Sequence, residues 1–470
     1  MLCNLGSIVT YASAAVAAFA GLAMAEIAPA VSYNNTLVYQ RADPQVLKHT
    51  DGWYYFTGSV PAYDKVVLRR SQTIQGLSDA EEVTVWDRAK STAGVGYVWA
   101  PELHWIGDKW YIYFALGRRS EFDIRMFVIE GEGENPLTAA WTEKPFIGTD
   151  YDTFSLDATT FEADGVRYLC WAQADPRYDN GAGTSLFLAK MDSPWTIVRP
   201  TTVVSRPALA WERIGHFVNE GAYVIQRNGR IFMTYSASAT DHNYAVGLLT
   251  APQGADLTDA SVWTKAQQPV LKSNERTSQY GPGHNSFTLS EDGLSDLIVY
   301  HARQYKDIVG EPLYNPDRHA RVQKLYWRED GTPDFGIPVP DGLTPVRLRA
   351  FGCGRSYLKH NEDAAATLEG GVPVELTQFR IVEAGDNVRL EATSYPGRFL
   401  SVAEDASLRL VAEPGANADF VQAAGLADEA GVSFESAGRP GEFIHAEGGV
   451  VVVKALASDK DNKGATFYTE

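Results

Sequence analysis

Three carboxylates occupy comparable places in this sequence and could together carry out acid–base chemistry. Asp43, Asp157 and Glu220 each precede two short apolar runs that are joined by a turn. An ionised carboxylate can accept a proton and a neutral carboxylic acid can donate one, and neighbouring carboxylates raise one another's pKa. We therefore interpret the three acids as one active site, which requires a fold that brings them together.

The region from residue 40 to about residue 335 repeats one pattern five times. Each repeat has a polar residue, a short strand, a turn containing Gly or Asp, and a second strand rich in aromatic residues. The polar residues are Asp43, Glu102, Asp157, Glu220 and His284, at intervals of 59, 55, 63 and 64 residues. Asp-Gly and Asn-Gly turns between apolar runs predict hairpins, and helical periodicity is hard to find.

A repeat of this length predicts an all-β fold, a five-bladed β-propeller over residues 26–340. Five blades would place the first residue of each innermost strand around one axial cavity, so that residues remote in sequence converge there. The alternative is that each acid only caps a turn. The shared position in all five repeats favours the common site.

Five motifs at these positions, covering about residues 36–340, resemble those of glycoside hydrolase family 43 and occur in the family's order. They are Arg41-Ala42-Asp43-Pro44, Trp99-Ala100-Pro101-Glu102-Leu103, Ser155-Leu156-Asp157-Ala158-Thr159, Asn219-Glu220-Gly221 and Tyr280-Gly281-Pro282-Gly283-His284-Asn285. The segment 318–334 resembles the arabinofuranosidase branch of that family. The invertase and levanase group, which also has five blades, is disfavoured because Glu220 is followed by Gly rather than Cys.

The resemblance implies that three acids hydrolyse a glycosidic bond with inversion. Asp43 would activate a water molecule as general base, Glu220 would protonate the leaving oxygen as general acid, and Asp157 would orient Glu220 and raise its pKa. An inverting glycosidase holds its base and acid about 6.5 to 9.5 Å apart so that the water fits between them. No cofactor is implied for this reaction.

Further residues are expected to bind the substrate. Trp99, with Phe217 or Phe154, could form an apolar platform for a furanose ring, although a tryptophan at such a position can also be ordinary core. Glu102 belongs to the same ring of predicted pocket residues. Arg321 resembles the arginine that closes the family's substrate pocket, and a surface ion pair is the competing interpretation.

His284 resembles the family's axial histidine, which approaches a metal ion or its water shell in the propeller channel. The resemblance implies a structural calcium or sodium ion there. A core histidine with satisfied hydrogen bonds is the competing interpretation, because no acidic cluster lies near His284 in the sequence.

A second domain is predicted after the Pro- and Gly-rich segment 334–342. The windows 346–358, 388–400 and 432–444 have similar sequences and begin 42 and 44 residues apart. Three such repeats of short strands predict a β-trefoil over residues 341–470. The trefoil resembles the arabinose-binding modules of carbohydrate-binding module family 42.

The trefoil departs from that family where the sugar would bind. The family has an aspartate three residues before a late Phe in each repeat, and this chain has Leu376, Asn417 and Gly464. The family's histidine is present only as His360, with Val402 and Ala446 in the other repeats. We expect sugar binding by this domain to be weak or lost, with one partial pocket left at His360, Asn417 or Asp461.

Composition and the N-terminus restrict the remaining function classes. The net charge of -18 disfavours nucleic acid as a partner, and 11 Trp, 23 Tyr and 20 Phe exclude a disordered chain.

The apolar run 5–24 ends in Ala23-Met24-Ala25, which predicts a signal peptide over residues 1–25 rather than a membrane anchor. Asn34-Asn35-Thr36 is a glycosylation sequon. Cys170 and Cys353 are predicted in different domains, so disulfides are not expected to stabilise the fold.

We therefore expect a secreted, monomeric, exo-acting α-L-arabinofuranosidase that does not associate with membranes. Its partners would be arabinan or arabinoxylan and their oligosaccharides. Activity as a β-D-xylosidase or an endo-arabinanase remains open, because these enzymes share the same cavity chemistry. The alternative outside the enzymes is a non-catalytic polysaccharide-binding protein.

Overall fold

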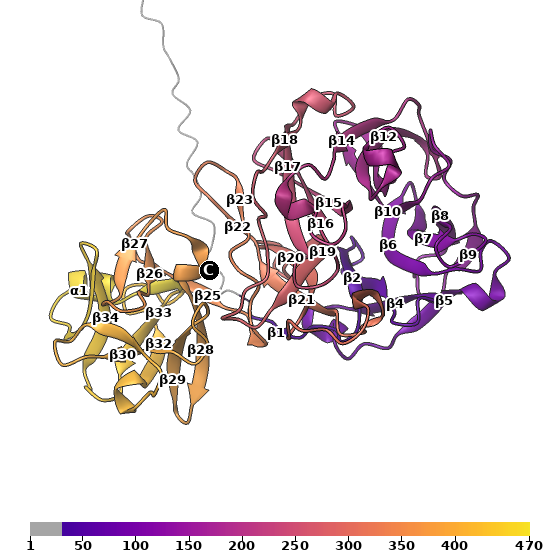
Figure 1. Ribbon diagram of the computed structural model, residues 1–470. Helices are drawn as coiled ribbons and strands as arrows, with labels where there is room; N and C mark the ends of the chain where they lie inside the picture. The colour runs from indigo at the N-terminus through magenta and orange to yellow at the C-terminus, as the bar shows by residue number, and fades with distance from the viewer. Residues whose placement is uncertain (1–30) are drawn as a thin grey trace, which may run out of the picture.

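Five antiparallel sheets follow one another along residues 42–324, because each predicted hairpin pairs with its neighbours in sequence. The computed structural model describes residues 31–470, and the sheets surround one axis as the five blades of a propeller (Figure 1). The predicted signal peptide, residues 1–25, lies outside the described residues. The strands of the five blades are, in order, β2 (Ala42–Lys48), β3 (Tyr54–Ser59), β4 (Lys65–Ser71) and β5 (Val83–Asp87); β6 (Val98–Ile106), β7 (Lys109–Gly117), β8 (Ile124–Glu132) and β9 (Ala140–Glu143); β10 (Ser155–Ala163), β11 (Val166–Gln173), β12 (Ser185–Ser193), β13 (Thr196–Ile197) and β14 (Thr202–Ser205); β15 (Asn219–Arg227), β16 (Arg230–Ala237), β17 (Ala245–Pro252) and β18 (Thr264–Lys265); and β19 (Tyr280–Leu289), β20 (Asp296–Arg303) and β21 (His319–Lys324).

The hairpin turns have the chemistry that the sequence predicts. Asp164 and Gly165 have φ angles of 50° and 76°, and Asn228 and Gly229 have φ angles of 55° and 69°. Positive φ at both central residues is the requirement of a type I′ turn, whose twist matches that of the flanking strands. These two turns therefore account for the tight connections β10–β11 and β15–β16.

The ring of blades is closed by the N-terminal segment. The Leu37 backbone N–H donates to the Ala320 carbonyl at 2.9 Å, and the Ala320 N–H donates to the Val38 carbonyl at 2.9 Å, so this segment adds to the free edge of β21. The Asn35 side chain donates to the Val322 carbonyl at 2.7 Å and accepts from its N–H at 2.9 Å. Chain segments nearly 300 residues apart thus share the fifth blade, which no local pattern could reveal.

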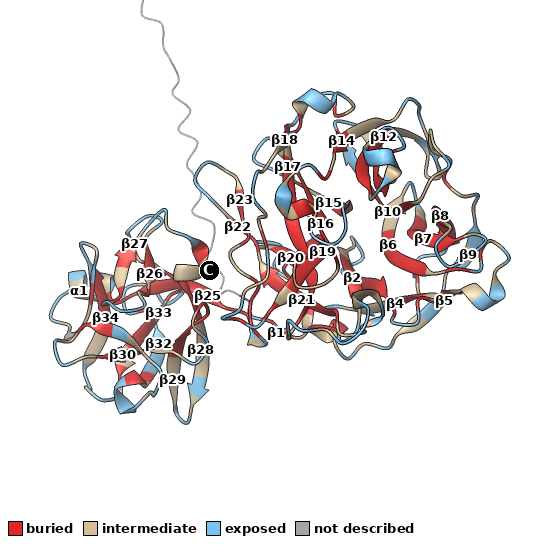
Figure 2. Cartoon of the chain, in the orientation of Figure 1, coloured by how far each residue is buried: buried red, intermediate tan, exposed pale blue. Residues whose placement is uncertain are grey.

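The blades pack on one another through apolar faces, which Figure 2 shows as buried strands. Between the first two blades, Leu68 and Trp86 meet Trp110 and Phe114 in one buried cluster. Cys170 is buried within the propeller, and Cys353 is exposed in the second domain, as free thiols. Apolar packing rather than a cross-link between these two cysteines holds the propeller together.

The second domain has the threefold arrangement that was predicted for a β-trefoil. Six of its strands, β25, β28, β29, β32, β33 and β36, pair in a closed ring, and three hairpins, β26–β27, β30–β31 and β34–β35, complete the sheet. The strand bounds are β25 (Val346–Ala350), β26 (Tyr357–Lys359), β27 (Thr367–Glu369), β28 (Gln378–Ala384), β29 (Asn387–Ala392), β30 (Phe399–Val402), β31 (Leu408–Val411), β32 (Phe420–Ala424), β33 (Val432–Ser436), β34 (Glu442–Glu447), β35 (Val450–Ala455) and β36 (Phe467–Thr469).

Helices are short throughout the described residues, and none is long and apolar enough to cross a membrane. The single α-helix of this part of the chain, α1 (Asp459–Gly464), begins after the Ser458 cap, whose side chain accepts from the Asp461 N–H. The 3-10 helices are η1 (Gln75–Leu77), η2 (Arg88–Lys90), η3 (Asp179–Gly181), η4 (Ala210–Glu212), η5 (Ala260–Val262), η6 (Pro312–Tyr314), η7 (Val374–Leu376) and η8 (Ala416–Ala418).

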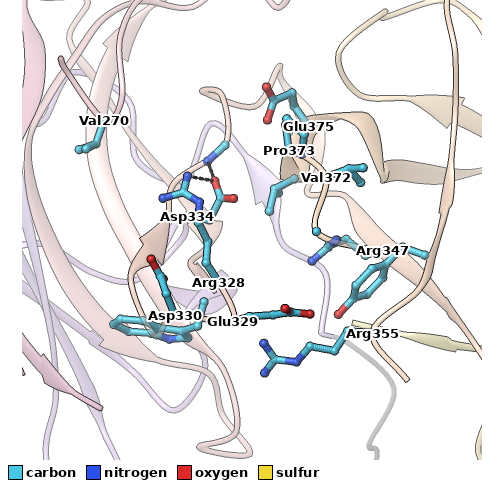
Figure 3. A pocket seen from close by; sticks show the side chains of 15 residues that line it. Val270, Arg328, Glu329, Asp330, Asp334, Arg347, Arg355, Val372, Pro373 and Glu375 are labelled. Atoms are coloured by element: carbon cyan, nitrogen blue, oxygen red, sulfur yellow. Dashed lines mark hydrogen bonds and ion pairs between the residues drawn. The ribbon is translucent and has the colours of Figure 1, made fainter. Parts of the chain in front are cut away.

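Two short pairings lie beside the junction of the domains. Strand β1 (Asn34–Asn35) pairs with β24 (Gly342–Leu343), and β22 (Tyr326–Trp327) pairs with β23 (Pro333–Asp334). The predicted boundary at residue 340 falls between β23 and β25. Beside it, the two domains enclose a cavity of about 580 Å³ (Figure 3).

Candidate active site

The innermost strand of every blade has a break in its pairing register at the same place. At each break one residue has a left-handed backbone: Asp43 (φ 53°), Ala100 (47°), Asp157 (55°), Gly221 (56°) and His284 (44°). Such bulges redirect side chains and occur beside active sites. For residues other than Gly this backbone costs roughly 1 to 3 kcal/mol and persists where the surroundings enforce it.

The predicted equivalence of the five polar residues is therefore only partly correct. Asp43, Asp157 and His284 occupy the bulge itself, but in the other two blades Ala100 and Gly221 do. Glu220 lies one residue before its bulge. Glycine is required at position 221, because a Cβ there would lie 2.9 Å from the His284 ring.

The three predicted catalytic acids line one pocket of about 380 Å³ at the propeller axis. Trp99 and His284 line it too, as does Arg318. The larger cavity at the domain junction contains none of the three acids. The predicted catalytic acids therefore belong to the smaller pocket.

Asp43 is held in its ionised form. The Ser59 hydroxyl donates to Asp43 Oδ2 at 2.6 Å, and Arg318 Nη1 and His284 Nδ1 lie 3.4 and 3.3 Å from Oδ1. Burial is the largest single influence and would raise the pKa of Asp43, but the Arg318 guanidinium, the two neighbouring histidines and the Ser59 hydrogen bond together hold the pKa well below its usual range. Burial lowers the pKa of His284, so Arg318 is the permanent positive charge.

The pKa values of Asp157 and Glu220 are raised, whereas that of Asp43 is lowered. Burial, opposed by a hydrogen bond from Tyr244, raises the pKa of Glu220 to about 7, and the Asp43 charge contributes to the rise. Burial followed by the charges of Glu220 and Asp43 raises the pKa of Asp157 well above its usual range. Because the repulsion between Asp157 and Glu220 is mutual, a proton near neutral pH is shared by the pair. The pocket thus contains a fixed carboxylate and a neutral acid together.

Tyr244 and His301 connect the base to the acid, and sequence reasoning missed both. The Tyr244 hydroxyl donates to Glu220 Oε1 at 2.8 Å, and its ring stacks on the His301 ring at 5.6 Å and 7°. His301 Nδ1 accepts the Asp43 backbone N–H at 3.0 Å. Gly283 makes room for this stack, since a Cβ there would lie 2.3 Å from the Tyr244 ring.

Arg321 is not the arginine of the pocket, so that prediction is wrong. It is fully buried beside the segment that joins the domains, where its Nη1 pairs with Asp341 Oδ1 at 2.6 Å and its Nη2 donates to the Val339 carbonyl. Arg318, three residues earlier on the approach to β21, enters the pocket instead. Side chains alternate between the faces of a strand, so a shift of three residues moves an arginine to the other face.

The predicted apolar platform is only partly in place. Trp99 lines the pocket and stacks on Tyr97 at 5.5 Å, and Phe154 lines it too. Phe217 instead packs on the Arg213 guanidinium at 4.3 Å, outside the lining.

Glu102 lies outside the pocket lining, which corrects its assignment to the substrate. It follows the bulge of β6 by two residues, and its Oε2 lies 2.8 Å from His104 Nε2. Glu102 still adds to the negative charge that raises the pKa of Asp157.

His284 is the residue that was expected near a structural metal ion. Within residues 31–470, no group of three or more His, Cys, Asp or Glu side chains could hold a metal ion. His284 Nδ1 faces Asp43, and its backbone N–H donates to Ser236 Oγ at 2.7 Å. Calcium takes six to eight oxygen ligands. Any ion near His284 would therefore need backbone carbonyl or water oxygens for most of its ligands.

The three predicted trefoil sugar residues lie apart. His360 is buried, with Nε2 3.1 Å from Ser394 Oγ. Asn417 is exposed, and Asp461 pairs with Lys454 at 2.5 Å. Each was expected as an alternative place for one partial pocket, and among the described residues no hydrogen bond or ion pair joins any two of the three.

Comparisons with known proteins agree in both domains. Residues 33–333 match the profile described as glycosyl hydrolases family 43, and residues 388–470 match the alpha-L-arabinofuranosidase B (ABFB) domain. The chain is 61% identical over 411 residues to "Alpha-L-arabinofuranosidase B" of Pyricularia oryzae, covering 85% of this chain and 84% of that protein. It is 54% identical over 362 residues to "Extracellular exo-alpha-(1->5)-L-arabinofuranosidase" of Streptomyces avermitilis, covering 77% and 75%. The solved α-L-arabinofuranosidase of Lactobacillus brevis is 49% identical, with a TM-score of 0.63, and the match covers 66% of this chain and 98% of that one.

Proposed function

The chain belongs to glycosyl hydrolases family 43, and from this premise we propose that it is an exo-acting α-L-arabinofuranosidase of inverting mechanism. Its substrates would be terminal arabinofuranose residues of arabinan or arabinoxylan. One observation carries the proposal: a single pocket holds an ionised carboxylate, Asp43, and a carboxyl group, Glu220, whose pKa burial raises to about 7.

The reaction needs one proton accepted and one proton donated. A water molecule attacks the anomeric carbon and gives a proton to Asp43, while the glycosidic C–O bond breaks and its oxygen takes the proton of Glu220. Asp157 accepts the Gly221 backbone N–H at 3.1 Å, which fixes the strand next to Glu220, and the repulsion between the two carboxyl groups disfavours the ionisation of both at once. Asp43 then releases its proton to solvent and Glu220 regains one.

Product analysis on linear arabinan beside arabinoxylan tests this function. We expect arabinose as the sole early product, and NMR recorded during the reaction should show the β-anomer first, because inversion of an α-linkage yields it. A ladder of oligosaccharides would indicate endo-arabinanase activity, and xylose would indicate a xylosidase. Binding to the polymers without release of sugar would favour a non-catalytic protein.

Replacing Tyr244 with Phe should move the alkaline limb of the kcat profile to higher pH. The hydroxyl stabilises the ionised form of Glu220, so its removal raises the pKa at which the acid is lost. Hydrogen bonds to charged groups contribute about 1.5 to 3 kcal/mol, which corresponds to a shift of roughly one to two pH units. Tyr235→Phe is the matched control, because Tyr235 donates to the buried Glu212 at 2.8 Å in the same blade. An unmoved limb in Tyr244→Phe would contradict this role.

We propose further that no cofactor takes part in the hydrolysis, because the acid and the base are both side chains. Prolonged treatment with EDTA should leave kcat within about twofold of its starting value, since removal of metal leaves these acids unchanged. A loss of thermal stability that calcium restores would instead point to an ion near His284 held mainly by water.

We also propose that the protein is secreted as a monomer. The predicted signal peptide and the name of the Streptomyces relative support secretion. Asn34 of the sequon is exposed, as a glycosylated asparagine must be. Light scattering and mass spectrometry of the protein from culture medium would check both points.

A further inference from the structure

The junction of the two domains contains a groove that the hydrolysis does not use. Its central cavity of about 580 Å³ is lined by Trp327 and Arg328 of the propeller side and by Arg347 and Tyr357 of the trefoil side (Figure 3). Two further hollows, of about 420 and 590 Å³, adjoin it. Trp327 and Arg355 line all three. The hollows therefore form one continuous groove.

Arg347 is a buried cation without an acidic partner. Its side chain belongs to a residue that is 7% exposed, its Nε donates to Thr377 Oγ1 at 2.7 Å, and its guanidinium lies 3.4 Å from the centre of the Tyr357 ring. Its two terminal nitrogens have no hydrogen-bond partner among the described residues. These two nitrogens reach the solvent of the groove rather than lying sealed in the interior, so they can donate to a ligand there.

The charges around the central cavity favour a ligand without net charge. Figure 3 shows basic and acidic side chains from both domains around the cavity. Only Arg328 and Asp334 form an ion pair, at 3.1 Å. An anion would meet the acids and a cation would meet the arginines, whereas sugar hydroxyls can donate to carboxylates and accept from guanidinium groups. The charged lining residues are Arg328, Arg347, Arg355, Glu329, Asp330, Asp334 and Glu375.

We propose that this groove binds a stretch of neutral pentose polysaccharide, apart from the catalytic pocket. The choice of sugar rests on the proposed function. Trp327, whose indole N–H donates to Asp296 Oδ2 at 2.9 Å, supplies an aromatic surface for the C–H groups of a sugar ring. Two linked binding sites keep an enzyme on a polymer by raising the effective concentration of its chain ends.

The state of the trefoil explains why such a site would lie at the junction. Asp461 is engaged by Lys454 and by the Ser458 hydroxyl, and His360 is buried against Ser394, so two of the positions expected to hold sugar are occupied by the domain's own contacts. The groove instead offers groups that lack partners.

Affinity electrophoresis of the full chain carrying Glu220→Gln, through gels containing debranched arabinan or linear xylan, tests the proposal. We expect retention by at least one of these neutral polymers, and the added change Arg355→Ala should raise the dissociation constant about tenfold, because it removes a charged hydrogen-bond donor. Arg355 is exposed and forms no ion pair among the described residues, so its loss should leave the melting temperature unchanged. Arg409→Ala, which removes an exposed arginine elsewhere in the trefoil, is the matched control.

Three results would contradict polysaccharide binding in the groove. They are no retention by either polymer, equal retention of the Arg355→Ala chain, or stronger retention by polygalacturonate than by the neutral polymers. The measurement does not depend on hydrolysis. If the unmodified chain releases no arabinose but retention still depends on Arg355, the catalytic proposal fails and the groove stands. If arabinose is released but neither polymer retains the chain, the catalytic proposal stands and the groove proposal fails.

Discussion

Replacing Asp43 with Asn is expected to lower kcat by about 10²- to 10⁴-fold, the range that a positioned general base contributes. Asn has nearly the same shape but cannot accept a proton from the attacking water. The loss should be similar for arabino-oligosaccharides and for aryl arabinofuranosides, because water must be activated whatever the leaving group is. Steady-state rates on both substrates, measured beside the unmodified protein, provide the test.

The control for this prediction is Asp164→Asn. Asp164 lies in a hairpin turn outside the pocket, and an Asn-Gly turn suits its positive φ equally well, so its rate and stability should be unchanged. The Asp43→Asn chain should remain folded, although Arg318 loses the carboxylate 3.4 Å away and some stability with it. A folded Asp43→Asn chain with nearly full activity would show that Asp43 is not the base.

Replacing Glu220 with Gln should lower kcat on arabino-oligosaccharides to a comparable extent, about 10²- to 10⁴-fold. A sugar leaves only when its oxygen is protonated, whereas a nitrophenolate leaves without that help. The loss on nitrophenyl arabinofuranoside should therefore be much smaller. The alkaline limb near pH 7 should also disappear, because the pKa of Glu220, which burial raises, produces it.

Glu102→Gln tests whether an acid matters for catalysis because of its place in the pocket or because of its place in the repeat. Glu102 is one of the acids that the repeat pattern grouped with Glu220, yet it lies outside the pocket lining and contacts His104. We expect its loss to change kcat less than tenfold, because it only contributes charge at a distance. Equal losses for Glu220→Gln on the sugar and nitrophenyl substrates would contradict the assignment of Glu220 as the acid.

The propeller and its axial site could be predicted because their signals are local. The Asp-Gly and Asn-Gly turns, such as Asp164-Gly165, specify hairpins within a few residues, and five copies of one hairpin pattern specify blades. The trefoil followed from its own period in the same way. The motifs around Asp43, Asp157 and Glu220 then indicated which end of each inner strand carries the chemistry.

The errors all concern the direction of a side chain. The pattern could not show that the bulge of β6 falls at Ala100, which leaves Glu102 outside the pocket. It selected Arg321 where Arg318 enters the pocket. Tyr244 and His301 had no signal, because their partners Glu220 and Asp43 are 24 and 258 residues away in the chain.

The sequence by itself therefore determined the all-β class, the two domains' repeats and the three acids, since hairpins, periods and motifs depend on neighbouring residues. Only the tertiary structure decided which arginine faces Asp43, what holds Glu220, how the N-terminal segment closes the ring, and that a groove separates the domains. Register, burial and charge balance arise from contacts between residues far apart in the chain, and a linear pattern does not contain them.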